Sequence, residues 1–306
     1  SYTDSDTEGH RQADVLSSLG TIMPIDGSTF ALFSTGIAGK IPVTTNALNP
    51  GDERGTWFKT KNGVPYDEAT LRMTLQVPTY MHYLYYDIQF FTSEYPEYVG
   101  SEYNDRVIVT VDSPSKGITT YTIDVNSGDF ILDSHDIPGT GFDIFATSGD
   151  PDLLDWVDTT PRNPGADAGA TALVGREHPV SPNEQINVTI NIKDVGDSLC
   201  DSAAFIDNLL FSGYAKTEII ARKTAKDING EFLECEDIIE YTTTISNIGA
   251  ADQSNNPGNE FEDFIPDNTT YVNDSLTATS GILEYDAGEN KIAWNGEIPS
   301  ESSVAL

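Results

Sequence analysis

Basic residues are scarce in this sequence. Its 306 residues include 16 Lys and Arg against 49 Asp and Glu, which gives a formal net charge of -33 at pH 7. A charge of this sign repels phosphate backbones and anionic membrane surfaces, so we expect no nucleic-acid partner. The chain is nevertheless predicted to fold, because 38% of its residues are hydrophobic and 10% are aromatic. Dense surface carboxylates favour a secreted or cell-surface protein in a salt-rich or calcium-containing medium.

Long hydrophobic runs are also absent. A membrane-spanning helix needs about 18 to 20 consecutive apolar residues, and the most apolar stretch, Tyr80–Phe91, contains His82 and Asp87. We therefore expect no membrane insertion by this segment. The first eight residues have neither the basic nor the apolar region of a signal peptide, so a secreted protein would be present in its mature form.

Cysteine is limited to Cys200 and Cys235. Two cysteines are too few for a disulfide-rich scaffold, and their spacing fits neither a zinc site nor a redox pair. Both precede predicted strands on opposite sides of a proposed domain boundary. We predict that they form one disulfide in an oxidising exterior, the alternative being two buried free thiols.

Apolar and polar residues alternate with period two in four runs, namely Leu71–Val77, Val107–Val111, Tyr121–Val125 and Ile186–Ile192. Turn-forming clusters such as Asn163-Pro164-Gly165 separate such runs, a pattern that predicts strands joined by loops. Helical signals are short, as at Asp14–Leu19 and Pro151–Trp156. The predicted class is all-β.

A break in the pattern divides the chain into two predicted domains. It falls at Phe211–Gly213, and a second series of strands follows it. We place the boundary at 213 to 217. Residues 1–213 have the size of a jelly-roll-like β-sandwich, and residues 217–306 have the size of an immunoglobulin-like β-sandwich.

The first predicted domain carries a recognisable central segment. Phe91–Asp105 reads FTSEYPEYVGSEYND and is followed by the strand Val107–Val111, with DGSTFALFSTG upstream at Asp26–Gly36 and GDSLCDSAAFIDNL downstream at Gly196–Leu209. Over about residues 20–212 the sequence resembles the choice-of-anchor L domain of bacterial and archaeal surface proteins. The resemblance implies an extracellular β-sandwich attached to a cell surface, and it supplies no catalytic residues.

The second predicted domain resembles another surface module. ARKTAKDING at Ala221–Gly230, CEDIIEYTTTISNIG at Cys235–Gly249 and FIPDNTTYV at Phe264–Val272 look like the immunoglobulin-like conserved repeat known as domain of unknown function eleven. Such a repeat would continue a strand past Leu306. Either the chain continues beyond the given sequence, or a strand from another subunit fills the place.

Calcium is the cofactor that the acidic loops suggest, because Ca²⁺ takes 6 to 8 oxygen ligands from carboxylates, amides and carbonyls. One acidic cluster lies in the central segment and one near the end of the same domain. We predict a site that uses some of Glu94, Asn104, Asp105, Asp201 and Asp207. A further cluster, Asp150, Asp152, Asp155 and Asp158, either binds a cation or faces solvent beside a short helix.

Glycans enter in two ways, as possible partners and as possible modifications of the chain. Seven tyrosines could form a sugar-stacking platform or could instead pack in the core, namely Tyr80, Tyr83, Tyr85, Tyr86, Tyr95, Tyr98 and Tyr103. The glycosylation acceptor pattern begins at Asn187, Asn268 and Asn273.

No catalytic motif stands out. Four scattered histidines have no triad or metal spacing, and no phosphate loop, dinucleotide fingerprint or zinc-protease helix is present. We predict a non-catalytic extracellular surface protein, either an adhesin or a structural subunit of a filament, sheath or stalk, which associates with itself or with neighbouring surface proteins. The alternatives are a calcium-dependent carbohydrate-binding module and, less favoured, a secreted glycan-active enzyme.

Overall fold

The predicted all-β class is confirmed. The computed structural model describes residues 1–4, 12–41, 67–96, 98–134, 136–143, 168–196, 200–230 and 234–306. Within these ranges every regular element is a β-strand except one 3₁₀ turn, η1 (Ala38–Lys40). The described part of the chain contains no helix with the length and apolar character needed to cross a membrane. The chain forms two units, Ser1–Tyr214 and Ala215–Leu306, and the division falls within the predicted range of 213 to 217.

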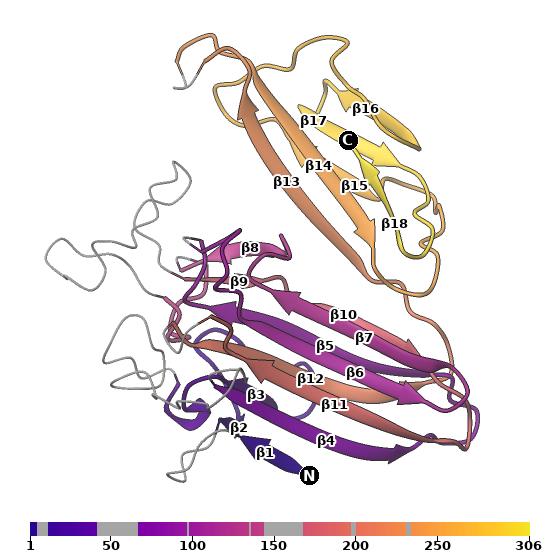
Figure 1. Ribbon diagram of the computed structural model, residues 1–306. Coiled ribbons are helices and arrows are strands. Elements are labelled where there is room, and N and C mark those ends of the chain that lie inside the picture. The colour runs from indigo at the N-terminus through magenta and orange to yellow at the C-terminus, as the bar shows by residue number, and fades with distance from the viewer. Residues whose placement is uncertain are drawn as a thin grey trace, which may run out of the picture. The chain divides into compact units, whose positions relative to one another are not determined.

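The first sheet of the first unit is antiparallel and has five strands (Figure 1). Their spatial order is β1 (Tyr2–Asp4), β4 (Glu68–Gln76), β11 (Gln185–Lys193), β6 (Arg106–Ser113) and β7 (Gly117–Asp124). The period-two pattern explains which side chains face inward: Ile186, Val188, Ile190 and Ile192 of β11 are buried. One face of this sheet therefore packs on the core.

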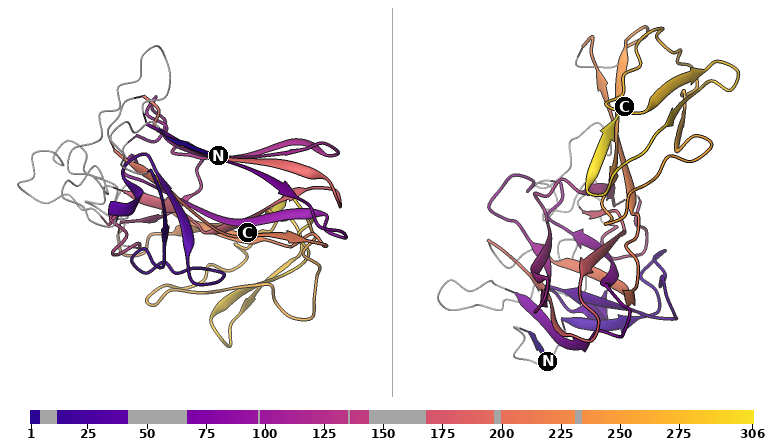
Figure 2. Two further views of the ribbon diagram at one scale, coloured as in Figure 1. Left: turned by 90° about the horizontal axis from the view of Figure 1, so that it is seen from below. Right: turned by 90° about the vertical axis from the view of Figure 1, so that its right-hand side faces the viewer.

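The second sheet forms the other layer of this unit (Figure 2). Its order is β2 (Ala13–Leu16), β3 (Phe30–Ser34), β12 (Ser202–Ser212), β5 (Tyr83–Thr92), β9 (Gly169–Thr171) and β8 (Phe130–Asp133), and β10 (Val174–Pro179) also pairs with β5. The helical signal at Asp14–Leu19 is wrong. Its first residues belong to β2, where pairing with β3 supplies the hydrogen bonds that a helical turn would have made locally.

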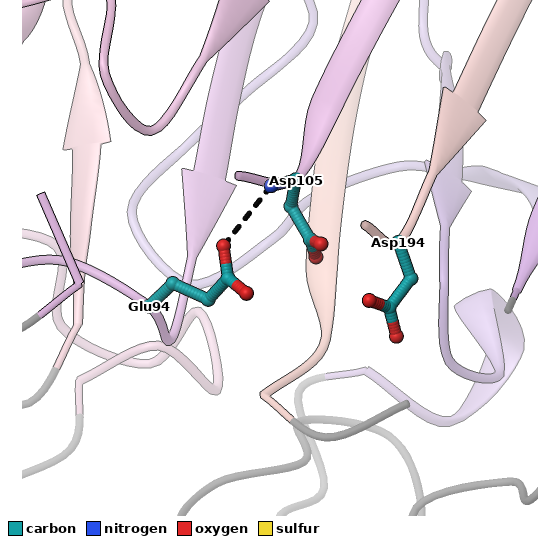
Figure 3. A group of neighbouring side chains, drawn as sticks. All are labelled: Glu94, Asp105 and Asp194. Atoms are coloured by element: carbon teal, nitrogen blue, oxygen red, sulfur yellow. Dashed lines mark hydrogen bonds between the residues drawn. The ribbon is translucent and has the colours of Figure 1, made fainter. Parts of the chain in front are cut away.

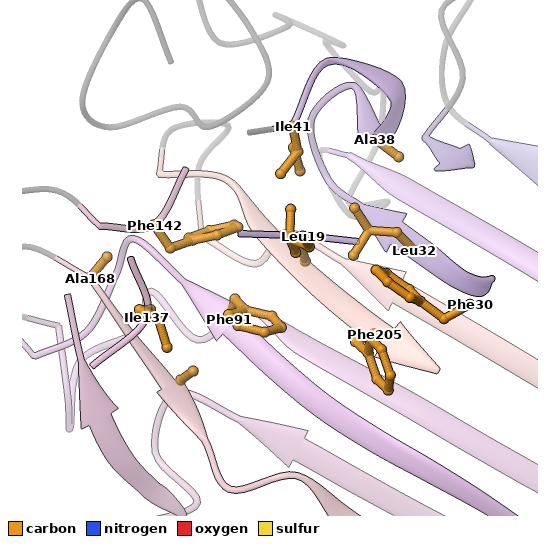
Figure 4. Close-up of a cluster of buried hydrophobic side chains, with 12 residues drawn as sticks. Leu19, Phe30, Leu32, Ala38, Ile41, Phe91, Ile137, Phe142, Ala168 and Phe205 are labelled. Atoms are coloured by element: carbon orange, nitrogen blue, oxygen red, sulfur yellow. The ribbon is translucent and has the colours of Figure 1, made fainter. Parts of the chain in front are cut away.

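The central strand β5 is covered on both faces. Leu84, Tyr86, Ile88 and Phe90 lie on the face toward the first sheet, while Phe91 belongs to a second hydrophobic cluster on the outer face (Figure 4). Side chains of β3, β12 and the connecting segments complete this outer cluster, among them Leu19, Phe30, Phe142 and Phe205. The first unit thus has apolar packing on both sides of its second sheet.

The second unit consists of two antiparallel three-stranded sheets. One has the order β13 (Ile219–Asp227), β14 (Ile239–Asn247) and β18 (Ser302–Ala305), and the other has the order β15 (Phe261–Phe264), β17 (Lys291–Asn295) and β16 (Ile282–Asp286). Its buried core is small and comprises Ile245, Trp294, Ile298 and Val304. β18 pairs with only Thr244–Asn247 of β14, so the other half of β14 has β13 as its one strand neighbour among the described residues.

Candidate metal centre

Five buried carboxylates gather at one end of the first β-sandwich. Asp67 precedes β4, Glu94 lies two residues after β5, Asp105 precedes β6, Asp194 follows β11 and Asp201 precedes β12. In an antiparallel sheet the start of one strand lies beside the end of its neighbour. These five residues therefore lie at the same end of both layers. The exposed fractions are 0% for Asp67, Asp105 and Asp194 and 1% for Glu94 and Asp201.

Three of the five carboxylates form the tightest group. Glu94, Asp105 and Asp194 each offer an oxygen, and these oxygens all lie within 4.8 Å of one another (Figure 3). The backbone N–H of Asp105 donates to Glu94 Oε2 at 3.0 Å, which holds the Glu94 side chain against the start of β6. Residues from three separate segments therefore converge on one space.

The Asp105 carboxylate is oriented by groups of two other segments. Val195 N–H donates to Oδ1 at 2.9 Å, and the Ser202 hydroxyl donates to Oδ2 at 2.6 Å. The same Ser202 hydroxyl also lies 2.8 Å from Thr92 Oγ1 at the end of β5. These bonds fix the position of the carboxylate but do not neutralise its charge.

Asp194 is the carboxylate of the tight group whose two oxygens receive no hydrogen bond from the described residues. Both oxygens are buried. Burial, followed by the negative charges of Asp105, Asp67 and Asp201, raises the pKa of Asp194 far above its usual range. A buried carboxylate among other carboxylates is costly unless a cation or a proton compensates it.

The arrangement offers the chemistry of a hard-cation site. All its donors are carboxylate oxygens, the ligands that Ca²⁺ and Mg²⁺ prefer, and neither Cys nor His belongs to the tight group. A spread of 4.8 Å between oxygens equals about twice a Ca–O distance of 2.3 to 2.6 Å. A single Ca²⁺ ion could therefore touch all three side chains.

The predicted ligands divide into those that join this cluster and those that do not. Glu94 and Asp105 lie in its centre, and Asp201 is close enough for its charge to act on Asp194. Asn104 does not join: its Oδ1 accepts a hydrogen bond from Asn126 N–H in a surface turn.

Asp207 does not join the cluster either. It lies six positions along β12 from Asp201, about 20 Å at the usual strand rise. Its Oδ2 accepts the backbone N–H groups of Ile25 and Asp26 instead. The acidic residues Asp150, Asp152, Asp155 and Asp158 lie outside the described residues.

Sequence reasoning missed Asp67 and Asp194. A signal was available, since each acid directly adjoins a strand of clear period-two pattern, Asp67 before β4 and Asp194 after β11. These two strands pair with each other throughout, from Glu68 opposite Lys193 onward. Acids at paired strand ends are therefore a better guide to such a site than acid density in a loop.

The predicted disulfide is not formed in the structure. Cys200 is buried in the first unit and Cys235 is exposed in the second. A bond would have to join the two units, so the pairing under oxidising conditions stays a prediction. Mass spectrometry of unreduced peptides tests it, because two alkylatable thiols in the folded chain would rule the bond out.

The tyrosines do not form a common platform. Tyr85 and Tyr86 are buried in β5, whereas Tyr80 is 81% exposed. Tyr95 stacks on Phe130 at 4.8 Å, and Tyr98 meets Tyr103 edge to face at 5.1 Å. Their rings are used for packing within the unit rather than for one flat binding surface.

The three glycosylation candidates occupy different settings. Asn187 is exposed on β11, and its Oδ1 accepts the hydroxyl of Thr74 on the neighbouring strand. Asn268 and Asn273 are exposed in the segment between β15 and β16. Glycosylation at these positions stays a prediction.

Comparison with protein-family models and with curated proteins gives no match. Among solved structures, the chain is similar to TmCBM61 in complex with β-1,4-galactotriose, with a TM-score of 0.30 and 8% sequence identity. The alignment covers 69% of this chain and 87% of that one. The trisaccharide is a ligand of TmCBM61, and no sugar site is carried over to this chain.

Proposed function

We propose that this chain is a non-catalytic, extracellular surface protein whose first unit is stabilised by a buried Ca²⁺ ion. In this proposal it works by adhesion or by assembly with other copies. The observation that carries the calcium part is the carboxylate of Asp194, which is 0% exposed and has no hydrogen-bond donor among the described residues. A cation bound there would compensate its charge together with those of Glu94 and Asp105.

Calcium suits this site better than the other common divalent cations. Mg²⁺ usually keeps several bound waters, whereas these carboxylates are closed off from solvent. Zn²⁺ favours sulfur and nitrogen ligands, and the tight group is made of carboxylates. A cage of protein oxygens with flexible geometry is the usual environment of Ca²⁺.

The closure of the site supports a structural role for the ion. A catalytic metal keeps an open coordination position that substrate or water can reach. Here all five acids have exposed fractions of 0 to 1%, and they are anchored to strand ends of both sheets. An ion at this place would fasten the two layers together.

The surface and assembly parts of the proposal rest on different features. The net charge of -33 favours a screened, cation-rich exterior, and the resemblances to choice-of-anchor L domains and to the immunoglobulin-like repeat point to surface proteins. Calcium-dependent carbohydrate binding is the second candidate, and a glycan array run with and without Ca²⁺ tests it.

Elemental analysis and calorimetric titration test the calcium site. The full chain should be purified without chelator, analysed for bound metal, then stripped with EGTA and titrated separately with CaCl₂ and MgCl₂. We expect bound calcium in the untreated protein and saturable heat with Ca²⁺ that far exceeds the response to Mg²⁺. No metal in the untreated protein together with no heat from Ca²⁺ would refute the site.

A further inference from the structure

The strand β13 carries a concentration of positive charge that the rest of the sequence lacks. Arg222, Lys223 and Lys226 fall within five positions, in a chain with only 16 basic residues and a net charge of -33. All three are exposed, and Lys223 forms an ion pair with Asp263 of β15 within the unit. The strand is at the edge of its sheet, because β14 is its one strand partner in the described part of the chain.

The backbone of β13 has open hydrogen-bonding positions along that edge. Ile228 N–H donates to Ile238 O at 3.1 Å, and Ile248 N–H donates to Glu218 O at 2.8 Å, so even-numbered positions bond toward β14. In an antiparallel ladder the odd-numbered residues then direct N–H and C=O away from β14. Ala221 and Ala225 are two such residues, and both are exposed.

The other sheet of the same unit ends in an acidic edge. β16 lies at the end of the order β15, β17, β16, and in the described residues β17 is its one strand neighbour. Glu284 and Asp286 are exposed, whereas Leu283 and Tyr285 between them are partly buried. Ile282, on the same strand, is 62% exposed. One edge of the unit is therefore basic and the other is acidic.

We infer that β13 of one copy of this chain pairs with β16 of a second copy, so that sheets of successive second units join head to tail. The inference rests on the assembly part of the proposed function and names the partner. Opposite charges on facing strands stabilise such pairing, and added main-chain hydrogen bonds extend the sheet. Lysines on an edge usually discourage association, but here every approaching copy is strongly acidic.

Geometry sets the form of the assembly. The two edges belong to different strands, so the contact is heterologous and each copy keeps one further edge for the next copy. Contacts of this kind form rings when the rotation closes and open filaments when it does not. The exposed side chains of Ile219, Ile228 and Ile282, at 41%, 52% and 62%, add apolar area to the two edges.

Charge reversal tests the contact with the full chain in saturating Ca²⁺, using sedimentation velocity and electron microscopy over a concentration series. We expect wild type to form larger species as concentration rises. Lys226→Glu, which places an acid on the basic edge, and Glu284→Lys, which places a base on the acidic edge, should each weaken association by about tenfold. An equimolar mixture of the two variants should restore it, because each then meets a complementary edge.

Matched controls separate this contact from general charge effects. Lys116→Glu and Glu301→Lys make the same charge changes at exposed positions outside the two edges and should assemble like wild type. Ala225→Pro removes an N–H that points to the open edge, so it should block assembly while leaving the β13–β14 ladder and the melting temperature unchanged.

Two results would overturn the inference. One is that Lys226→Glu and Glu284→Lys assemble as wild type does, which would leave assembly in place but not through these edges. The other is a wild-type chain that stays monomeric at every concentration, which would remove the assembly part of the proposed function as well. Calcium binding in the first unit is measured separately and is untouched by either result.

Discussion

Replacing Asp194 by Asn gives the sharpest test of the buried carboxylate cluster. Two unit charges no more than 4.8 Å apart repel by at least about 3.5 kcal/mol at an effective dielectric constant of about 20. Without a cation, Asp194 relieves this repulsion by holding a proton, since burial and neighbouring acids raise its pKa far above the usual range. Asn has nearly the same shape as a protonated Asp. In EGTA at about pH 4 or below, where the unfolded chain also keeps this proton, the Asp194→Asn variant and wild type should therefore melt at similar temperatures.

The two proteins should differ once calcium is added. A ligand at a hundred times its dissociation constant stabilises the folded state by about 2.7 kcal/mol. For a unit the size of Ser1–Tyr214 this corresponds to a rise in melting temperature of about 5 to 11 °C. Wild type should show this rise in differential scanning calorimetry, and Asp194→Asn should show little of it because a ligand charge is gone.

The pH dependence of the metal-free protein adds an independent readout. Asp194 has a raised pKa in the folded state, so above about pH 4 the folded state binds more protons than the unfolded state. Stability in EGTA should then fall as pH rises above about 4, and Asp194→Asn should remove part of this slope. The sign is opposite to that of an ordinary salt-bridged carboxylate.

Asp207→Asn is the matched control, since Asp207 lies in the same unit but outside the cluster. It should keep the full calcium-dependent rise. The reasoning fails if wild type melts at the same temperature in EGTA and in Ca²⁺, or if Asp194→Asn retains the whole shift.

Two further predictions concern His178 in the first unit and Gly281 beside Trp294 in the second. Burial, together with the charge of Arg176, lowers the pKa of His178 to about 4. The free energy of unfolding should therefore fall as pH drops from about 6.5 to about 4, by up to about 1.4 kcal/mol per pH unit. Urea denaturation of His178→Gln at several pH values should lack this slope. Gly281→Ala would bring a Cβ to 2.5 Å from Trp294 Nε1 and should destabilise the second unit by about 1 to 3 kcal/mol. Gly258→Ala shares a positive φ but has nothing within 4 Å, so calorimetry should show a clearly smaller loss.

The strand framework was predictable from sequence because period-two alternation directly reports which side chains are buried. The runs at Val107–Val111 and Ile186–Ile192 became β6 and β11. Local signals failed where pairing decided the structure, as at Asp14–Leu19, whose first residues pair with β3 residues 14 to 18 positions later in the chain.

The candidate site was only partly predictable, for the same reason. Glu94 and Asp105 are neighbours in sequence, so an acidic loop pointed to both. Asp194 reaches Asp105 only because β11 pairs with β6, a partner about ninety residues earlier in the chain. Asp207 has the right chemistry but sits in the middle of a strand, and composition alone does not distinguish a strand end from its interior.

Burial of β5 on both faces has a consequence for synthesis and folding. Its partners β9, β10 and β12 all come from Gly169–Ser212, so they leave the ribosome some eighty to 120 residues after β5. During that interval Tyr83–Thr92 is an apolar strand without its neighbours, the kind of segment that aggregates. Asp87 is the one charged residue in this run. Asp87→Val should therefore lower the soluble yield strongly, while the protein that has already folded loses comparatively little stability.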